Sequence, residues 1–370
     1  MSTTSKKADY NFISLFFILL IFGMMVLSSA SVAVGINSFD DPYFFVKRQF
    51  FLGFLPGFFL FIILSKINYN FWRKLSAPIF LLGLFLLFLV FVPGIGSTNN
   101  TSSSSWINLF GYSFQPAEAM KMSLIIYMAA FFAKMGDKIK DFKEGFLVAL
   151  GVGMLPIAMV ILQPDIGTTA ILFSILFAML FFAGAKFSHM SGLVLAAVIG
   201  FIFLVIIAPY RAHRLTTFLH PELDPQGQGY QINQAFLAVG SGGLFGLGFG
   251  HSRQKFQYLP EVHGDSIFAI MSEEMGFVMV VGFLSLLFLL LKRGFSIAVN
   301  TKDEFGRLLV TGVMSWLFVQ SFLNIGAIVG LLPLTGVPLP FVSHGGSALM
   351  IGMASMGIVV SVSKHADMKA

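Results

Sequence analysis

Asp265 is the acidic residue whose position most favours chemistry, because it stands where a long apolar run begins. A carboxylate in a partly dry cavity can serve as a general base. An aspartate at the start of a helix is also favoured by capping and by the helix dipole, so a structural role stays open. Glu273 and Glu274 follow roughly 12–14 Å deeper along a helix. Acids at such a depth indicate a functional site, and a hydrogen-bonded structural role is the alternative.

Basic residues accompany this acid in the polar segment 210–264. Four of them precede Asp265, namely Arg211, Arg214, Arg253 and Lys255. Because Arg and Lys grip phosphate oxygens, the segment is a candidate site for a phosphate-bearing ligand. A solvated loop that attracts anionic lipid is the other interpretation. The glycines between 240 and 250 let the backbone approach a ligand closely.

A second acid–base pair, Glu118 and Lys121, lies three residues apart on one face of a predicted helix. Pro116 just before it fits the first turn of that helix. The pair is either an intrahelical ion pair or a charged wall of a substrate cavity. Asp165 lies between two apolar runs, where we expect its side chain to cap a turn.

Several other kinds of site are excluded by the sequence. It has no cysteine, and hence no disulfide framework, thiolate nucleophile or cysteine metal site. The seven histidines lack HExxH spacing, and His220, His251 and His263 share the polar segment without a zinc pattern. There is no Walker A sequence, and Gly240-Ser-Gly-Gly243 lacks the GxSxG spacing of a nucleophile elbow.

Long apolar runs position these residues. The 370 residues are 56% hydrophobic and 11% charged, whereas soluble proteins carry about a quarter charged residues. A membrane core takes about 20 apolar residues per helix. We therefore predict an all-α polytopic membrane protein, a single domain over residues 1–370, with about ten transmembrane helices near 12–34, 49–65, 76–95, 117–134, 144–162, 167–185, 190–209, 265–291, 306–331 and 346–362.

Lysine and arginine set the expected orientation. Most of the 23 lie near the termini and in the loops of one face, which the positive-inside rule makes cytoplasmic. Both termini are then cytoplasmic, and the polar segments 96–116, 210–264 and 332–346 face outside. Three prolines forbid a regular helix in the last of these. The net charge of +6 follows from this placement, so no nucleic-acid partner is expected.

An ordered set of stretches runs over nearly the whole chain: Ser-Ser-Trp106-Ile, Gln115-Pro-Ala-Glu118-Ala-Met-Lys121, Gln163-Pro-Asp165-Ile-Gly167-Thr, Asp224-Pro-Gln-Gly-Gln-Gly-Tyr-Gln231, Leu259-Pro-Glu261-Val-His263-Gly-Asp265, Glu273-Glu274-Met-Gly276 and Pro338-Leu-Pro-Phe-Val-Ser-His344-Gly-Gly-Ser347. The set resembles the SEDS family (shape, elongation, division and sporulation) of integral-membrane peptidoglycan polymerases. The Gly-Tyr-Gln231 turn is similar to the division and sporulation branch rather than to the elongation branch. Where the family usually has Thr and Phe around the aspartate, this chain has Gly264 and Ser266, and His344 replaces a usual tyrosine.

The resemblance implies a peptidoglycan glycosyltransferase that polymerises lipid II at the outer face of the bacterial cytoplasmic membrane during cell division. In that reaction the 4-hydroxyl of the acceptor sugar attacks the anomeric carbon of the donor, and the lipid diphosphate leaves. Asp265 is the expected base. The expected substrate-binding residues are Arg211, Arg214, Lys255, Glu118, Lys121, Gln231, Glu261 and His263.

The resemblance also implies a partner, a class B penicillin-binding protein with transpeptidase activity, together with other division proteins and membrane lipid. A divalent cation (Mg²⁺ or Mn²⁺) is compatible with Glu261 and Asp265, two carboxylates close in the chain, but the sequence defines no ligand set. Two other functions stay open. A lipid II flippase depends on charge inside the spans, and a non-catalytic division scaffold tolerates substitution of Asp265.

Overall fold

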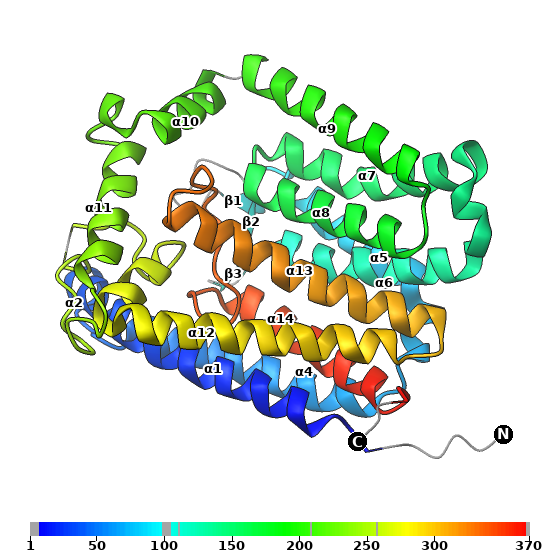
Figure 1. Ribbon diagram of the computed structural model, residues 1–370, viewed down its shortest axis with the longest axis horizontal. Coiled ribbons are helices and arrows are strands. Elements are labelled where there is room, and N and C mark those ends of the chain that lie inside the picture. Colours follow the sequence, from blue (N-terminus) through cyan, green and yellow to red (C-terminus); the bar gives the residue numbers. More distant parts are fainter. Residues whose placement is uncertain (1–6, 98–104, 110–111, 208, 257, 368–370) are drawn as a thin grey trace.

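The computed structural model describes residues 7–97, 105–109, 112–207, 209–256 and 258–367 as a bundle of long helices with one small sheet (Figure 1). The first half contains α1 (Tyr10–Ala30), α2 (Val32–Phe39), α3 (Phe44–Gln49), a π-helical turn η1 (Phe50–Phe54), α4 (Leu55–Lys66), α5 (Asn70–Leu89), α6 (Pro116–Met135), η2 (Gly136–Lys140), η3 (Phe142–Phe146) and α7 (Leu147–Leu162). The second half contains α8 (Ile166–Phe182), α9 (Phe187–Ile207), α10 (Pro209–Leu219), η4 (Pro221–Leu223), α11 (Gln228–Ser241), α12 (Ile267–Val299), α13 (Glu304–Ile328) and α14 (Gly346–Ser363).

The apolar runs fold into helices of membrane-spanning length. Among the described residues, eight helical stretches are long and apolar enough to cross a membrane. They are Tyr10–Ala30, Phe44–Lys66, Asn70–Leu89, Pro116–Lys140, Phe142–Leu162, Ile267–Val299, Glu304–Ile328 and Gly346–Ser363. Two shorter apolar helices, Ile166–Phe182 and Phe187–Phe203, coincide with the other two predicted runs. The helical architecture is therefore confirmed, while the count of ten spans stays a prediction for α8 and α9.

The first and last helices meet at one end of the bundle (Figure 1). The Asp9 carboxylate caps α1 and also pairs with Arg293 Nε at 2.8 Å, and its backbone N–H donates to Ser363 Oγ at 3.2 Å. Three distant parts of the chain are thereby held together where α1 begins and α14 ends. This contact agrees with the prediction that both ends of the chain lie on the same side of the membrane.

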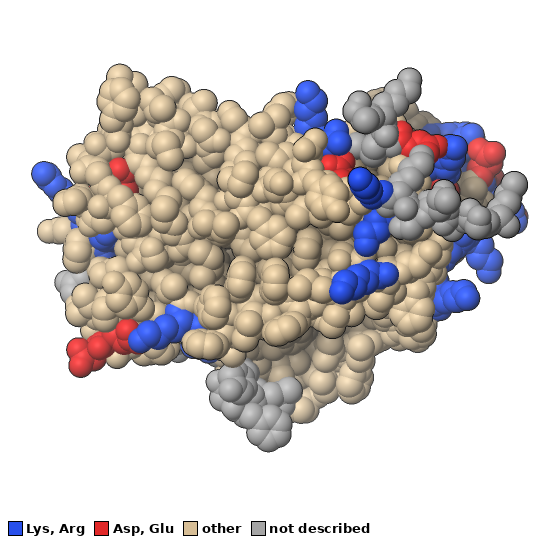
Figure 2. Space-filling model, turned by 90° about the horizontal axis from the view of Figure 1, so that it is seen from below, with Lys and Arg blue, Asp and Glu red and all other residues tan. Residues whose placement is uncertain are grey.

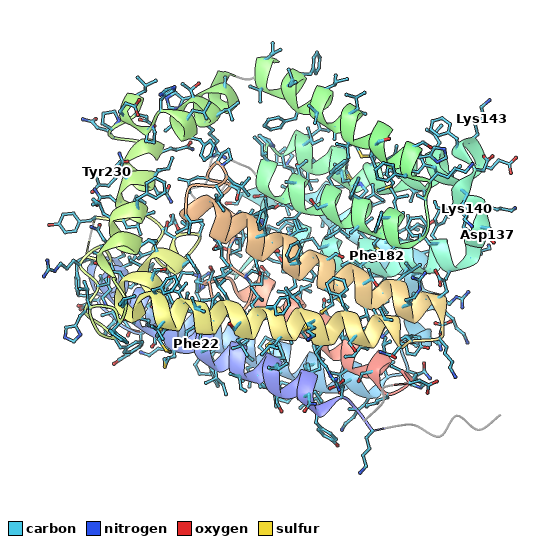
Figure 3. The ribbon with its side chains drawn as sticks, in the orientation of Figure 1. Phe22, Asp137, Lys140, Lys143, Phe182 and Tyr230 are labelled. Carbon is cyan, nitrogen blue, oxygen red and sulfur yellow. The ribbon has the colours of Figure 1, made fainter. Side chains whose placement is uncertain are left out.

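Charged residues are distributed as a membrane requires. Lys, Arg, Asp and Glu gather toward the two ends of the face in Figure 2 and leave a central band without them. Asp137, Lys140 and Lys143 lie toward the end of the bundle where α1 begins and α14 ends, whereas Tyr230 of α11 lies at the other end (Figure 3). The end that holds Tyr230 is called the loop end below, and its placement outside the cell stays a prediction from charge.

The loop end is more ordered than the sequence indicated. Segment 210–264 contains α10, η4 and α11, none of which was predicted from the sequence. Segment 96–116 contributes a three-stranded antiparallel sheet of β1 (Gly96–Ser97), β2 (Trp106–Leu109) and β3 (Tyr112–Phe114), in the order β1-β2-β3. Strands this short carry almost no alternating pattern, so the sequence contains no signal for them.

Candidate active site around Asp265

Asp265 immediately precedes the N-cap of α12, and its carboxylate faces other side chains rather than the helix. Gln231 Nε2, from α11, donates to Asp265 Oδ1 at 3.4 Å and to Ser266 Oγ at 3.1 Å. Ser266 Oγ in turn lies 3.3 Å from Asp265 Oδ1. The N-cap residue of α12 is Ser266, and its side chain makes no capping bond. The capping role that the sequence left open for Asp265 is therefore not what the structure contains.

Two other parts of the chain hold the backbone around Asp265. One is α13, from which Asn324 Nδ2 donates to Asp265 O at 2.7 Å and to Val337 O at 2.8 Å. The other is the proline-rich segment 332–345, called the strap below. Ser343 Oγ donates to Gly264 O at 2.7 Å. The strap and α13 together fix the backbone that carries the carboxylate.

The surroundings of Asp265 raise the pKa of its carboxyl group, which makes the carboxylate a better proton acceptor. Burial and the nearby charge of Glu261 raise the pKa of the Asp265 carboxyl to about 6. The hydrogen bonds from Ser266 and Gln231 favour the charged form and oppose this rise. At neutral pH the carboxylate is thus mostly ionised, with a pKa suited to taking a proton from a bound hydroxyl.

Two histidines pack beside this group. The His263 ring lies 4.1 Å from the Phe45 ring and 5.8 Å from the His344 ring, between centroids. His263 Nε2 is also 4.0 Å from a carboxylate oxygen of Glu261. Burial lowers the pKa of His263, and burial with the charges of His263 and Arg48 lowers the pKa of His344 to about 3. Both rings are therefore neutral near pH 7.

Arg48 is a cation of this site that the sequence did not single out. Its charge contributes to the lowered pKa of His344, and the residue is partly exposed. Its neighbour on α3, Lys47, pairs with Asp41 at 2.8 Å instead. The sequence gives no reason to treat Lys47 and Arg48 differently. Only the fold shows that Lys47 is ion-paired with Asp41 whereas Arg48 acts on His344.

Glu118 and Lys121 form a buried ion pair with 2.8 Å between the charged groups. Lys121 Nζ also donates to Gln320 Oε1 at 2.8 Å and lies 4.8 Å from the centre of the Trp316 ring. Gln320 Nε2 reaches the strap at Pro338 O (2.9 Å). Glu118, Trp316 and Gln320 line a small cavity under the strap. The intrahelical ion pair predicted for Glu118 and Lys121 is thus confirmed, whereas their role as a wall of a substrate cavity stays a prediction.

The polar face of α13 was not predicted from the sequence. Trp316, Gln320 and Asn324 follow one another at four-residue spacing and are buried. They connect the Glu118–Lys121 pair to the backbone of Asp265 through the contacts above. The sequence did contain a signal for this face. Gln320 and Asn324 are amides four residues apart inside an apolar helix, and such amides need buried hydrogen-bond partners.

The ammonium of Lys255 is bound by groups of the protein itself and not left for a substrate. Its ammonium contacts Glu274 Oε1 at 2.7 Å, Gly250 O at 2.8 Å and Ser29 Oγ at 3.0 Å, and only 3% of the residue is exposed. Ser29 also donates to the Glu274 carboxylate. This buried ion pair ties the polar segment to α1 and α12. We therefore place Lys255 outside the group that faces a substrate.

The Glu273 carboxylate is likewise held by hydrogen bonds inside the protein. Its carboxylate accepts from Ser252 Oγ at 2.5 Å and from the backbone N–H of Arg253 at 3.1 Å. Glu273 and Glu274 are each 3% exposed or less. The hydrogen-bonded alternative for these two deep acids is the one that the structure contains. Asp165 likewise has a structural role, because it caps α8 through the N–H of Thr168 at 2.9 Å.

The remaining predicted residues are brought together only in part. Asp265, Gln231, Glu261 and His263 form one group at the loop end. Arg214 lies on α10 and is partly exposed, with no contact to Asp265 in the described part of the chain. The side chain of Arg211, on the same helix, lies outside the described residues. No cluster of three or more His, Asp or Glu residues that could hold a metal occurs among the described residues.

Comparison with known proteins places the chain and its fold in a family. A family model described as "Cell cycle protein" (FtsW, RodA and SpoVE) matches residues 9–368. The stage V sporulation protein E of Bacillus subtilis is 40% identical over 99% of both chains. A Geobacter sp. protein named probable peptidoglycan glycosyltransferase FtsW is 42% identical over 94% of both chains.

Solved structures agree with these relatives. A chain from a peptidoglycan synthase complex that coordinates polymerization and crosslinking superposes with a TM-score of 0.80, at 28% identity, over 96% of this chain and 97% of that one. The rod shape determining protein RodA of Thermus thermophilus superposes with a TM-score of 0.71, at 25% identity, over 98% of both chains. The family model covers nearly the whole chain, and the chain therefore belongs to the FtsW, RodA and SpoVE family of integral membrane proteins.

Proposed function

We propose that this chain is a peptidoglycan glycosyltransferase of the division and sporulation type, which polymerises lipid II. The observation that carries the proposal is the partly buried Asp265, with its pKa raised to about 6, in a chain whose relatives are named peptidoglycan glycosyltransferases. A carboxylate of that pKa is mostly ionised at neutral pH and is still basic enough to accept a proton.

In the proposed step, the 4-hydroxyl oxygen of the acceptor sugar attacks the anomeric carbon of the donor. Asp265 Oδ takes the hydroxyl proton as the new glycosidic bond forms. The bond from the anomeric carbon to the lipid diphosphate breaks, and its electron pair leaves with the diphosphate. Gln231 orients the carboxylate through its contact with Oδ1. Glu261 keeps the pKa of that carboxylate high by repulsion.

The departing diphosphate needs positive charge nearby. Arg48 is our first candidate, because its charge already acts on His344 beside His263. Arg214, with Arg211 on the same helix, is the second. Lys255 is left out, since Glu274 occupies its ammonium. Mg²⁺ or Mn²⁺ bound by Glu261 and Asp265 stays a prediction on which no step of this mechanism depends.

The growing strand also has to be crosslinked. The similar solved chain belongs to a complex that coordinates polymerization and crosslinking. By analogy we propose that this chain works with a class B penicillin-binding protein that supplies the transpeptidase. Other division proteins and the outward orientation of Asp265 are part of the same proposal.

The test is glycan-strand synthesis from purified lipid II, with each variant reconstituted beside its transpeptidase. We expect Asp265→Asn to lose polymerisation while it still binds the partner. Glu222→Gln is the matched control, because Glu222 is an exposed acid of the same loop end that pairs only with His220 among the described residues. We expect this control to retain full activity.

Each alternative outcome has a meaning. Equal synthesis by wild type and Asp265→Asn rejects Asp265 as the base. Translocation of lipid II across vesicles without any synthesis by the wild type favours a flippase. For the leaving group, Arg48→Gln is expected to lower kcat, whereas the neighbouring Lys47→Gln has little effect because Lys47 pairs with Asp41.

A further inference from the structure

Helix α12 is interrupted at Gly276, whose φ of 71° and ψ of 179° are not helical. In a continuous helix the carbonyls of residues 273 and 274 accept from the N–H groups four residues later. In α12 they accept from a different segment instead. Leu247 N–H donates to Glu273 O at 3.0 Å, and Gly248 N–H donates to Glu274 O at 3.0 Å.

The N–H groups released by the break are also satisfied by that segment. Phe277 N–H donates to Gly243 O at 2.9 Å, and Val278 N–H donates to Leu244 O at 3.1 Å. The backbone of residues 243–248 thus takes the place of one turn of the α12 hydrogen-bond ladder. A Cβ on Gly276 would lie 2.2 Å from the backbone nitrogen of Gly246, so glycine is required at this contact.

The contact lies well inside the long apolar helix α12. Phe277 is ten residues after the start of α12 at Ile267, or about 15 Å along the axis. The residues from Ile267 to Gly276 are all buried in the protein. From Phe277 onward α12 exposes apolar side chains, and Phe277 itself is 62% exposed. Residues 243–248 therefore meet α12 where the exposed apolar face of this helix begins.

The large side chains of the segment that bonds to α12 are also apolar and exposed. Phe245 is 80% exposed, and Leu244, Leu247 and Phe249 are exposed as well. The sequence from 225 to 252 contains no Asp, Glu, Lys or Arg. Non-helical backbone is tolerated at membrane depth only where its polar groups are satisfied. The bonds to α12 satisfy the carbonyls of Gly243 and Leu244 and the N–H groups of Leu247 and Gly248.

We propose that residues 242–250 form a re-entrant segment that lies within the membrane leaflet on the Asp265 side. Leu244, Phe245, Leu247 and Phe249 contact the hydrocarbon tails of lipid, continuous with the exposed face of α12 that starts at Phe277. The long polar loop is then anchored in the bilayer between α11 and Asp265. The proposal stands apart from the glycosyltransferase assignment, because it concerns the lipid contact alone.

The absence of native cysteine makes the test direct, since every introduced cysteine is unique. Phe245→Cys and Phe249→Cys are spin-labelled in full-length protein, reconstituted alone in phosphatidylglycerol–phosphatidylethanolamine vesicles. Collision of each label with oxygen, which enters lipid, is compared with collision with a polar nickel chelate, which does not. Phe288→Cys, in the exposed middle of α12, is the lipid reference, and Glu222→Cys is the water reference.

We expect the ratio of oxygen to nickel collisions at 245 and 249 to match that at 288 and to exceed that at 222 by roughly tenfold or more. A ratio equal to that at 222 overturns the proposal, because the segment then faces water. Labels shielded from both reagents also overturn it, because a second copy of the chain then covers the patch. Both positions are exposed, and unchanged thermal unfolding of the labelled variants establishes that they are folded.

Discussion

The dependence of polymerisation on pH tests the Asp265 assignment most sharply. Asp265 acts as a base, so it must be ionised in the free enzyme. Its pKa of about 6 predicts that kcat/KM is near its plateau at pH 7 and half of it near pH 6. Below that point kcat/KM is expected to fall about tenfold for each pH unit, because the ionised fraction falls by that factor.

The fall in kcat/KM at low pH is called the acidic limb of the pH profile. Substitutions around Asp265 should move this limb in opposite directions. Glu261 raises the pKa by repulsion, so Glu261→Gln moves the limb to lower pH. Gln231 stabilises the ionised form, so Gln231→Ala moves it to higher pH. Glu222→Gln is the control, because no contact joins Glu222 to Asp265 in the described part of the chain, and its limb is expected to stay in place.

The assay is the initial rate of glycan formation at limiting lipid II, from about pH 5 to about pH 8. The position of the limb is compared between variants, whatever their plateau rates, since effects on binding change the plateau. A limb that stays in place in both Glu261→Gln and Gln231→Ala refutes Asp265 as its origin. A shift to higher pH in Glu261→Gln refutes the contribution that repulsion by Glu261 makes, beside burial, to the raised pKa.

Two further predictions concern stability, measured by thermal unfolding of the purified protein in detergent. Gly276→Ala should destabilise by about 2–4 kcal/mol, because its Cβ meets backbone at a positive φ. Gly282→Ala, in the same helix with open space around it, should change stability by less than about 1 kcal/mol, and equal losses would contradict a specific need for glycine at 276. Lys255→Met should cost about 3–5 kcal/mol by leaving the buried Glu274 carboxylate without its cation. Adding Glu274→Gln should recover most of that loss, and a single variant as stable as wild type would contradict the ion-pair role.

Much of the fold was predictable because its cause is local. Apolar runs of membrane-spanning length form helices wherever they occur, and each predicted run coincides with one. Pro116 begins α6 and Asp165 caps α8, as their residue types indicate. The helices within segment 210–264 were not predicted, because glycine and polar residues dominate its sequence. Their positions depend on tertiary packing, of α11 against α12 and α13 and of α10 against α9 and α11.

The sequence by itself determined that this is a helical membrane protein with acids at the edges of its spans and within them. Only the tertiary structure decided what each acid does. Glu273 meets Ser252 and the backbone after it, and Glu274 meets the ammonium of Lys255. In the described structure Asp265 instead keeps a weakly held carboxylate beside Gln231. The physical reason is that the pKa of a carboxylate and its freedom to bind another group depend on neighbours within a few ångströms. Those neighbours come from distant parts of the chain.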